Sequence, residues 1–299
     1  MIEFELRTRE LLAILKQELV PLCTVIDLTP HAYGVENCVF RAVTEEWGEV
    51  AVKVPWYRKV KNANDGKFNS IDGLVKEYKL TMHCSKHGIP VPLIHKLHKG
   101  DKIDFIIQEF IVAESGSSFP YEDMGRVTSS LHEIQDLPDL NPFDAHTIIS
   151  NRIIERTKTL EKLKGVHLPM PSVQENIAAL NSFEPKNRLL HMDIRPANII
   201  MHSSQVKAIF DWTNALIGDP VLELMRIKSY GYLNDDFIKG YRNYFGELSR
   251  VPQLVQWLYQ YDTTVMLALL FLTEIDAPEQ FELTFESLLR LHGSIKNKF

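Results

Sequence analysis

The pattern of apolar and polar positions changes character twice along the chain. Residues 1–18 place apolar side chains at helical spacing and predict a helix. From Cys23 to Phe110 the pattern becomes strand-like, with β-branched or alternating runs between turn-forming residues: CVFRAV, EVAVKV and DFIIQEFI. This first part of the chain therefore predicts a sheet-rich unit.

One predicted helix interrupts these strands. Ser70 is a suitable N-cap, and Leu74, Tyr78 and Met82 form a helical stripe that ends before GIPVP. The segment 57–69, which precedes this helix, is polar and basic, and we expect it to form a mobile loop.

Beyond Phe110, the stretch VAESGSSFP has the composition of a linker, and helical patterns then dominate. They cover residues 121–136, 143–165, 171–183, 219–230, 234–246, 251–275 and 278–295. One patch, LLHMDIRPANIIMHSSQVKAIFDW, instead predicts short strands and tight connections. We therefore expect an α+β fold of two lobes around a cleft, residues 1–110 and 111–299, with a linker at about 109–118.

Composition narrows the classes of protein. Apolar residues make up 45% of the 299 residues and charged residues 24%, which is typical of a globular protein and excludes a disordered or collagen-like chain. A net charge of -6 does not predict the positively charged surface that nucleic acid or an anionic membrane would require. Three scattered cysteines do not predict a disulfide framework, and residues 1–15 lack the apolar core of a signal peptide. We expect a cytoplasmic protein without membrane contact.

The negative charge lies wholly in the second part. Acidic and basic residues balance through Phe110, so the surplus of acids belongs to the residues beyond it. Between Val251 and Leu289 there is no Lys or Arg, but there are six carboxylates: Asp262, Glu274, Asp276, Glu279, Glu282 and Glu286. The last three have helical spacing and fit a solvated face, whereas the first three flank the apolar run 265–272 and need partners.

The strongest chemical signal is HMDIRPAN at residues 191–198, followed by IFDW at residues 209–212. Asp193 can accept a proton from an attacking hydroxyl, and Asn198 and Asp211 offer oxygen ligands that suit Mg²⁺. The runs NIIM and VKAIFD predict a hairpin that carries Asn198 and Asp211 to the same edge. A base and metal ligands in one small volume are what phosphoryl transfer requires.

These motifs resemble the aminoglycoside phosphotransferase and choline kinase branch of the protein-kinase-like superfamily. HMDIRPAN matches its H-x-D-x-x-x-x-N catalytic loop, IFDW stands where protein kinases have D-F-G, and GDPVLEL resembles a segment found just beyond. In that segment Glu223 stands where the family more often has Asp, and Arg195-Pro196 is closer to the Lys-Pro of protein kinases. Ser130-Leu131-His132-Glu133 is similar to an L-H motif on the first large helix.

The resemblance continues upstream, in the same order. Lys53 in VAVK matches the third-strand lysine that pairs nucleotide phosphates, and Glu77 matches the helix glutamate that holds it. Backbone groups of Glu109 and Ile111 would contact the base. The phosphate loop would be residues 31–37, HAYGVEN, with Gly34 and Asn37, although it has a single glycine. The resemblance implies ATP, or GTP, with Mg²⁺ as cofactors.

The resemblance also implies a role for residues that face the acceptor. Arg195 would contact the transferred phosphate. Aminoglycoside phosphotransferases bind the ammonium groups of their substrates through acidic groups of C-terminal helices, so Asp262, Glu274 or Asp276 would bind a cationic acceptor here. We expect a small-molecule kinase whose acceptor is an aminoglycoside, another antibiotic, an amino alcohol, a sugar or an amino acid.

Two other interpretations of the family stay open. A protein kinase is suggested by Arg195-Pro196, but no A-P-E-like segment follows IFDW, and the interval from Asp211 to Asp219 is too short for a long activation loop. A catalytically silent binding module would have no chemical need for the complete set of Lys, Glu, Asp, Asn and Asp.

Three further features have simpler explanations. His83 and His87 lie one helical turn apart, as zinc-binding histidines do, but H-E-x-x-H is absent and a solvated helix end is favoured. His191 is expected to orient or pack rather than to transfer protons. The aromatic run Trp257, Tyr259 and Tyr261 fits a substrate pocket or the core equally well.

Overall fold

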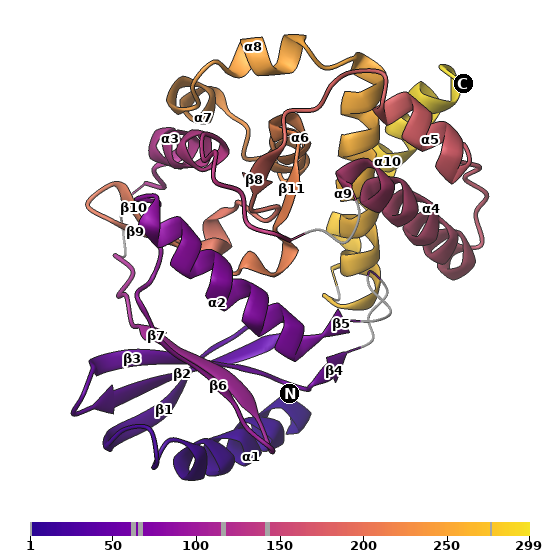
Figure 1. Cartoon of the computed structure of the whole chain (residues 1–299). Helices are drawn as coiled ribbons and strands as arrows, with labels where there is room; N and C mark the ends of the chain where they lie inside the picture. The colour runs from indigo at the N-terminus through magenta and orange to yellow at the C-terminus, as the bar shows by residue number, and fades with distance from the viewer. Residues whose placement is uncertain (1, 61–63, 65–67, 115–117, 141–143, 276) are drawn as a thin grey trace.

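The computed structural model describes residues 2–60, 64, 68–114, 118–140, 144–275 and 277–299. It has an antiparallel sheet near the N-terminus and a larger helical part beyond it, as predicted (Figure 1). Within the described residues, none of the helices combines the length and apolar character that crossing a bilayer requires.

The N-terminal lobe is built on a five-stranded sheet with the order β1-β2-β3-β7-β6. Its strands are β1 (Val25–Tyr33), β2 (Asn37–Thr44), β3 (Gly48–Pro55), β6 (Ile94–Lys99) and β7 (Asp104–Glu109), all paired antiparallel. Burial alternates along β2, as expected of a strand with one face on the core, whereas the last six residues of the central strand β3 are all buried.

Two helices cover the sheet. Helix α1 (Ile2–Glu18) packs Leu11 and Leu15 onto one face, and α2 (Ser70–Lys86) packs Leu74 against β6 and β7 on the other. In Figure 1, α2 lies between the sheet and the helical lobe. Its second half belongs to the other core, since Leu80 and Cys84 pack with residues of the C-terminal lobe.

Among the described residues, the C-terminal lobe contains helices and two short strand pairs. Its helices are α3 (Tyr121–His132), α4 (Ala145–Lys164), α5 (Val173–Leu180), α6 (Pro220–Ser229), α7 (Asp235–Gly240), α8 (Tyr244–Ser249), α9 (Gln253–Thr273) and α10 (Pro278–Lys296). Hairpin β9 (Ile199–His202) and β10 (Gln205–Ile209) has the predicted partners, and β8 (Arg188–Leu190) pairs with β11 (Leu216–Gly218). The lobe boundary at residue 110 stays a prediction, as does the exact extent of the linker, of which residues 115–117 lie outside the described ones.

The structure differs from the predicted elements in three places. Asn69, not Ser70, caps α2, because its side chain accepts the Ile71 amide hydrogen. The single helix expected over 234–246 is two helices, separated where Asn243 takes a left-handed conformation with φ of 53°. The segment 57–69 includes the short pair β4 (Lys59–Val60) and β5 (Phe68–Asn69), and its expected mobility stays a prediction.

Close packing of α3 and α7 brings a tyrosine to the catalytic region. A Cβ on Gly240 would lie 1.8 Å from the Glu122 carbonyl oxygen, and one on Gly125 would lie 2.1 Å from the Phe237 carbonyl oxygen. Because both positions are glycine, the two helices approach within backbone contact. Tyr241, the residue after α7, thereby reaches His132 at the end of α3.

Candidate active site

Three charged side chains meet between the lobes. Nζ of Lys53, on β3, lies 2.6 Å from a carboxylate oxygen of Glu77 on α2 and 3.3 Å from Oδ1 of Asp211, the residue two after β10. Lys53 and Glu77 are buried. The structure thus joins the predicted lysine and glutamate, which are 24 residues apart in the chain.

Charge pairing governs the protonation of this group. Burial alone would lower the pKa of Lys53, but the carboxylates of Asp211 and Glu77 raise it above its ordinary value. For Asp211, burial opposes ionisation, yet the Lys53 charge and a hydrogen bond from Thr213 lower the pKa overall. Burial dominates at Glu77 and raises its pKa. Lys53 therefore stays cationic and faces Asp211 as an anion.

Asp193 is held from two sides in the loop after β8. Its Oδ2 accepts a hydrogen bond of 2.7 Å from Nδ2 of Asn198, and its Oδ1 accepts one of 2.7 Å from the hydroxyl of Tyr230. Nε of Arg195 lies 3.2 Å from the same Oδ1. A carboxylate oxygen has further acceptor capacity, so this orientation leaves Asp193 able to take a proton.

A buried glutamate supports the loop that carries Asp193. Glu223, on α6, accepts hydrogen bonds from the backbone amides of His191 and Met192, and His132 pairs with it at 2.8 Å. Met192 has φ of 64°, a left-handed conformation that is uncommon outside glycine and asparagine, and the bonds to Glu223 hold it there. Glu223 and His132 therefore have positioning functions.

His191 connects the catalytic loop to the segment of Asp211. Its Nδ1 accepts the Asp193 amide hydrogen at 3.2 Å, while its Nε2 faces the Phe210 carbonyl oxygen at 3.2 Å and donates to it. The ring packs against Trp212 with centroids 4.5 Å apart. Because burial lowers the pKa of His191, the neutral imidazole that these two bonds require is favoured. The ring orients and packs, as the sequence indicated.

The β9–β10 hairpin brings Asn198 and Asp211 to one edge. Ile199 pairs with Ile209, and the Phe210 amide donates to the Asn198 carbonyl oxygen at 3.1 Å. Asn198 donates its Nδ2 hydrogens to Asp193, which leaves its side-chain oxygen for a cation, and Asp211 adds a carboxylate. One amide oxygen and one carboxylate are donors that suit Mg²⁺, which keeps further water and phosphate oxygens. The residues present therefore fit that ion.

The expected nucleotide loop forms the turn between β1 and β2. The Gly34 amide donates to the Asn37 carbonyl oxygen at 2.8 Å, and Nε1 of Trp56 donates to the Gly34 carbonyl oxygen at 2.8 Å. Glu109 ends β7, where its amide donates to the Leu93 carbonyl oxygen, and Ile111 lies two residues further on. A role of these groups in nucleotide binding stays a prediction.

A sequence model of the phosphotransferase enzyme family matches residues 27–257. That span contains every element of the site described above. The chain belongs to this family. Its members transfer phosphoryl groups, and this phosphotransferase acts on a hydroxyl group. A comparison of its sequence with curated proteins gives no match.

Solved structures of related fold cover nearly the whole phosphotransferase. A candidate fructosamine-3-kinase from Haemophilus somnus 129PT has a TM-score of 0.66 at 16% identity, over 94% of this chain and 96% of that one. A candidate aminoglycoside phosphotransferase from Ralstonia eutropha JMP134 has a TM-score of 0.58 at 16% identity, over 96% and 98%. A thermostable aminoglycoside phosphotransferase variant in complex with AMP-PNP and hygromycin B has a TM-score of 0.61 at 14% identity, over 93% and 97%. At such identities the likeness shows the kinase-like fold.

The three carboxylates expected to bind the acceptor do not share one environment. Asp262 is completely buried on α9, 2.8 Å from the guanidinium of Arg156, so it is not available to a substrate in this structure. Glu274, at the end of α9, is half-buried and hydrogen-bonded to Asn64 of the segment before α2. Asp276 lies outside the described residues.

The aromatic run on α9 belongs mainly to the core. Tyr259 and Tyr261 are fully buried, and their hydroxyls pair with His146 and Thr157, respectively. Trp257 packs against the same core and is partly buried. The core interpretation of these aromatics is therefore confirmed.

A chain of polar contacts that the motifs did not reveal leads away from Asp193. The Tyr230 hydroxyl, which donates to Asp193, accepts a hydrogen bond of 3.1 Å from Nε of Arg226, and Arg226 lies 3.9 Å from Asp262. Tyr230 caps α6 beyond the recognisable GDPVLEL segment. Its spacing from Asp193 has no sequence signature, so only the fold could identify it.

A surface pocket of about 350 Å³ lies away from the catalytic loop. It is lined by residues of α6, α9 and α10, among them Lys228, Gln260 and Ser287. Its lining has a basic side chain and no carboxylate, which does not match the expected cationic acceptor.

Proposed function

We propose that this phosphotransferase transfers the γ-phosphoryl group of ATP to a hydroxyl of a small, positively charged molecule. The observation that carries the proposal is the convergence of Lys53, Glu77 and Asp211 with the Asp193–Asn198 pair. These residues come from β3, α2, the loop after β10 and the loop after β8. The arrangement supplies the positioning and charge on which phosphoryl transfer depends.

Each side chain has a distinct part in the reaction. Lys53, held by Glu77 and kept cationic by Asp211 and Glu77, pairs with the nucleotide phosphates. Asn198 and Asp211 would hold Mg²⁺, which would neutralise negative charge on the phosphates. Asp193 accepts the proton of the acceptor hydroxyl while that oxygen bonds to the γ-phosphorus. The bond from the γ-phosphorus to the bridging oxygen breaks, and ADP leaves with its electron pair.

Arg195 is placed to assist the transferred group. Its guanidinium is partly exposed, at 39%, and reaches the Asp193 carboxylate. A swing of this side chain toward the cleft would bring its charge to the γ-phosphate, where developing charge is stabilised. Backbone groups of Glu109 and Ile111, at and beyond the end of β7, bind the nucleobase of ATP. The turn that contains Gly34 and Asn37 covers the nucleotide phosphates.

The acceptor class rests on charge. The acidic surplus lies entirely beyond Phe110, and Glu274 offers a half-buried carboxylate next to the interlobe contact with Asn64. Similar folds with bound hygromycin B or streptomycin, and a candidate fructosamine-3-kinase, support an amine-bearing acceptor. An aminoglycoside or other antibiotic is our preferred class, ahead of an amino alcohol, sugar or amino acid. We place the enzyme in the cytoplasm, where ATP is supplied and thiols such as Cys23 stay reduced.

A panel assay tests this function. ADP release from Mg²⁺-ATP is measured with aminoglycosides, other hydroxylated antibiotics, choline-like alcohols and sugars, and with GTP in place of ATP. We expect one amine-bearing class to accelerate ADP release, and its deoxy analogue, which lacks the acceptor hydroxyl, to be inert. Acceleration by neutral sugars alone would overturn the acceptor class. Acceleration by protein substrates added to the panel, and by none of the small molecules, would overturn the small-molecule assignment.

A further inference from the structure

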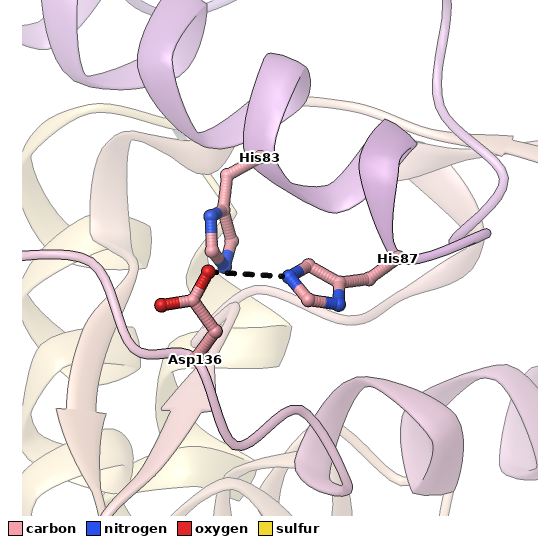
Figure 2. A group of neighbouring side chains, drawn as sticks. All are labelled: His83, His87 and Asp136. Carbon is pink, nitrogen blue, oxygen red and sulfur yellow. Dashed lines mark ion pairs between the residues drawn. The ribbon is translucent and has the colours of Figure 1, made fainter.

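A second group of ligand-type side chains lies at the far end of α2. His83 and His87 occupy its last turn and its C-cap, and Asp136 lies on the segment that follows α3 (Figure 2). One ligand atom from each residue lies within 4.8 Å of the others. Figure 2 shows the two rings and the carboxylate turned toward one another, and Nε2 of His87 lies 3.8 Å from Oδ2 of Asp136.

One ring nitrogen of this group is buried without a well-formed hydrogen bond. This atom is Nε2 of His83, and the backbone of Asp136 lies close enough to interact with the ring. The ring of His83 lies 4.7 Å from that of His87, so two groups that repel when protonated are held side by side.

We propose that His83, His87 and Asp136 bind a Zn²⁺ ion that ties α2 to the C-terminal lobe. Two imidazoles and one carboxylate are a common zinc donor set, with water in the fourth position. Tetrahedral bonds of about 2.0–2.2 Å place ligand atoms roughly 3.4 Å apart. The separations between ligand atoms, now up to 4.8 Å, therefore shorten by at most about 1.4 Å on binding, a movement that the exposed His87 and Asp136 side chains can make.

The position of the site gives the ion a structural consequence. Helix α2 carries Glu77, which holds Lys53, and its second half already packs on the C-terminal core through Leu80 and Cys84. A metal bond from the helix end to Asp136 fixes that half of the helix against the segment after α3. Bound Zn²⁺ therefore stabilises the arrangement of the lobes in which Lys53 meets Asp211.

Zinc titration of the whole chain tests the proposal. Metal-stripped protein competes with a chromophoric chelator for Zn²⁺. Excess Mg²⁺ is present so that Zn²⁺ does not bind at the proposed Mg²⁺ ligands Asn198 and Asp211. We expect one tight Zn²⁺ per chain, and at least about 10-fold weaker binding in H83A, H87A and D136N. The matched control is H167A, which removes an exposed histidine that pairs with a single carboxylate, Glu161, and leaves the affinity unchanged.

A stability measurement accompanies the titration. Zn²⁺ should raise the melting temperature of the wild-type protein and of H167A, and leave that of H87A and D136N unchanged. His87 and Asp136 lie at the surface, so these two variants keep the fold even if H83A does not. Absence of tight Zn²⁺ binding by the wild type, or equal affinity in H87A and D136N, would overturn the site.

Discussion

The Tyr230 hydroxyl donates a hydrogen bond of 2.7 Å to Oδ1 of Asp193, the carboxylate proposed to take the acceptor proton. The two residues are 37 positions apart and are joined through the packing of α6 on the catalytic loop. Burial raises the pKa of Tyr230, so its hydroxyl keeps the proton that it donates. Tyr230 therefore fixes the direction of the Asp193 carboxylate.

Replacing Tyr230 by Phe removes this hydrogen bond and keeps the ring. A hydrogen bond to a charged group contributes about 1.5–3 kcal/mol, and we expect kcat to fall about 10- to 100-fold. The KM for ATP should not change, because the hydrogen bond that is lost goes to Asp193 and not to Lys53, the proposed ligand of the nucleotide phosphates. Steady-state kinetics with Tyr232→Phe as the matched control measures this. Equal losses in both variants would mean that the hydrogen bond does not position Asp193.

Asp262 is expected to be structural and not a substrate ligand. Replacing it by Asn leaves Arg156 buried without its carboxylate partner, and breaking such a pair costs about 3–5 kcal/mol. Urea unfolding should show this loss, while the KM for the acceptor changes little. Glu282→Gln, on the exposed face of α10, serves as the control and should be neutral. A stable Asp262→Asn protein with a greatly raised acceptor KM would return this residue to the substrate site.

The lowered pKa of Lys76 predicts that the free energy of unfolding depends on pH. Burial and the nearby Arg152 charge lower its pKa from 10.5 to about 8, and its Nζ donates to the Thr213 carbonyl oxygen at 2.8 Å. Between these two values the unfolded chain holds a proton that the folded chain has released. The folded state is therefore stabilised as the pH rises from about 8 toward 10.5.

Comparison with Lys76→Met isolates this contribution. The stability of the wild type relative to the variant should increase by about 1–3 kcal/mol between about pH 7 and about pH 10. Urea unfolding at both pH values gives the difference. Lys79→Met, an exposed lysine on the same helix, should show no such change. A constant difference for Lys76→Met would show that the lysine titrates normally.

The motifs predict the local geometry of the candidate site because that geometry depends on short spacings in the sequence. Asn198 and Asp211 come to one edge through a hairpin whose strands are adjacent in the sequence, and the sequence predicted that hairpin. The two-lobed fold was also predicted correctly, since periods of two and 3.6 residues separate the sheet from the helices.

The remaining features depend on long-range packing. The charge of Asp262 is matched by Arg156, 106 residues earlier, and no local pattern indicates that pair. Tyr230 reaches Asp193 only because α6 docks on the catalytic loop. The helix over 234–246 is interrupted by Asn243, whose left-handed backbone overrides a continuous apolar pattern. His83 and Asp136 likewise come together only through the fold, because they lie 53 positions apart in the sequence.

The most direct test of the account is the Asp193→Ala variant, assayed for phosphoryl transfer to the acceptor found in the panel, with ATP binding measured in parallel. We predict a loss of about 10²- to 10⁴-fold in kcat, the range for removal of a general base, with little change in ATP affinity. Unchanged turnover in a folded Asp193→Ala protein would contradict the central claim.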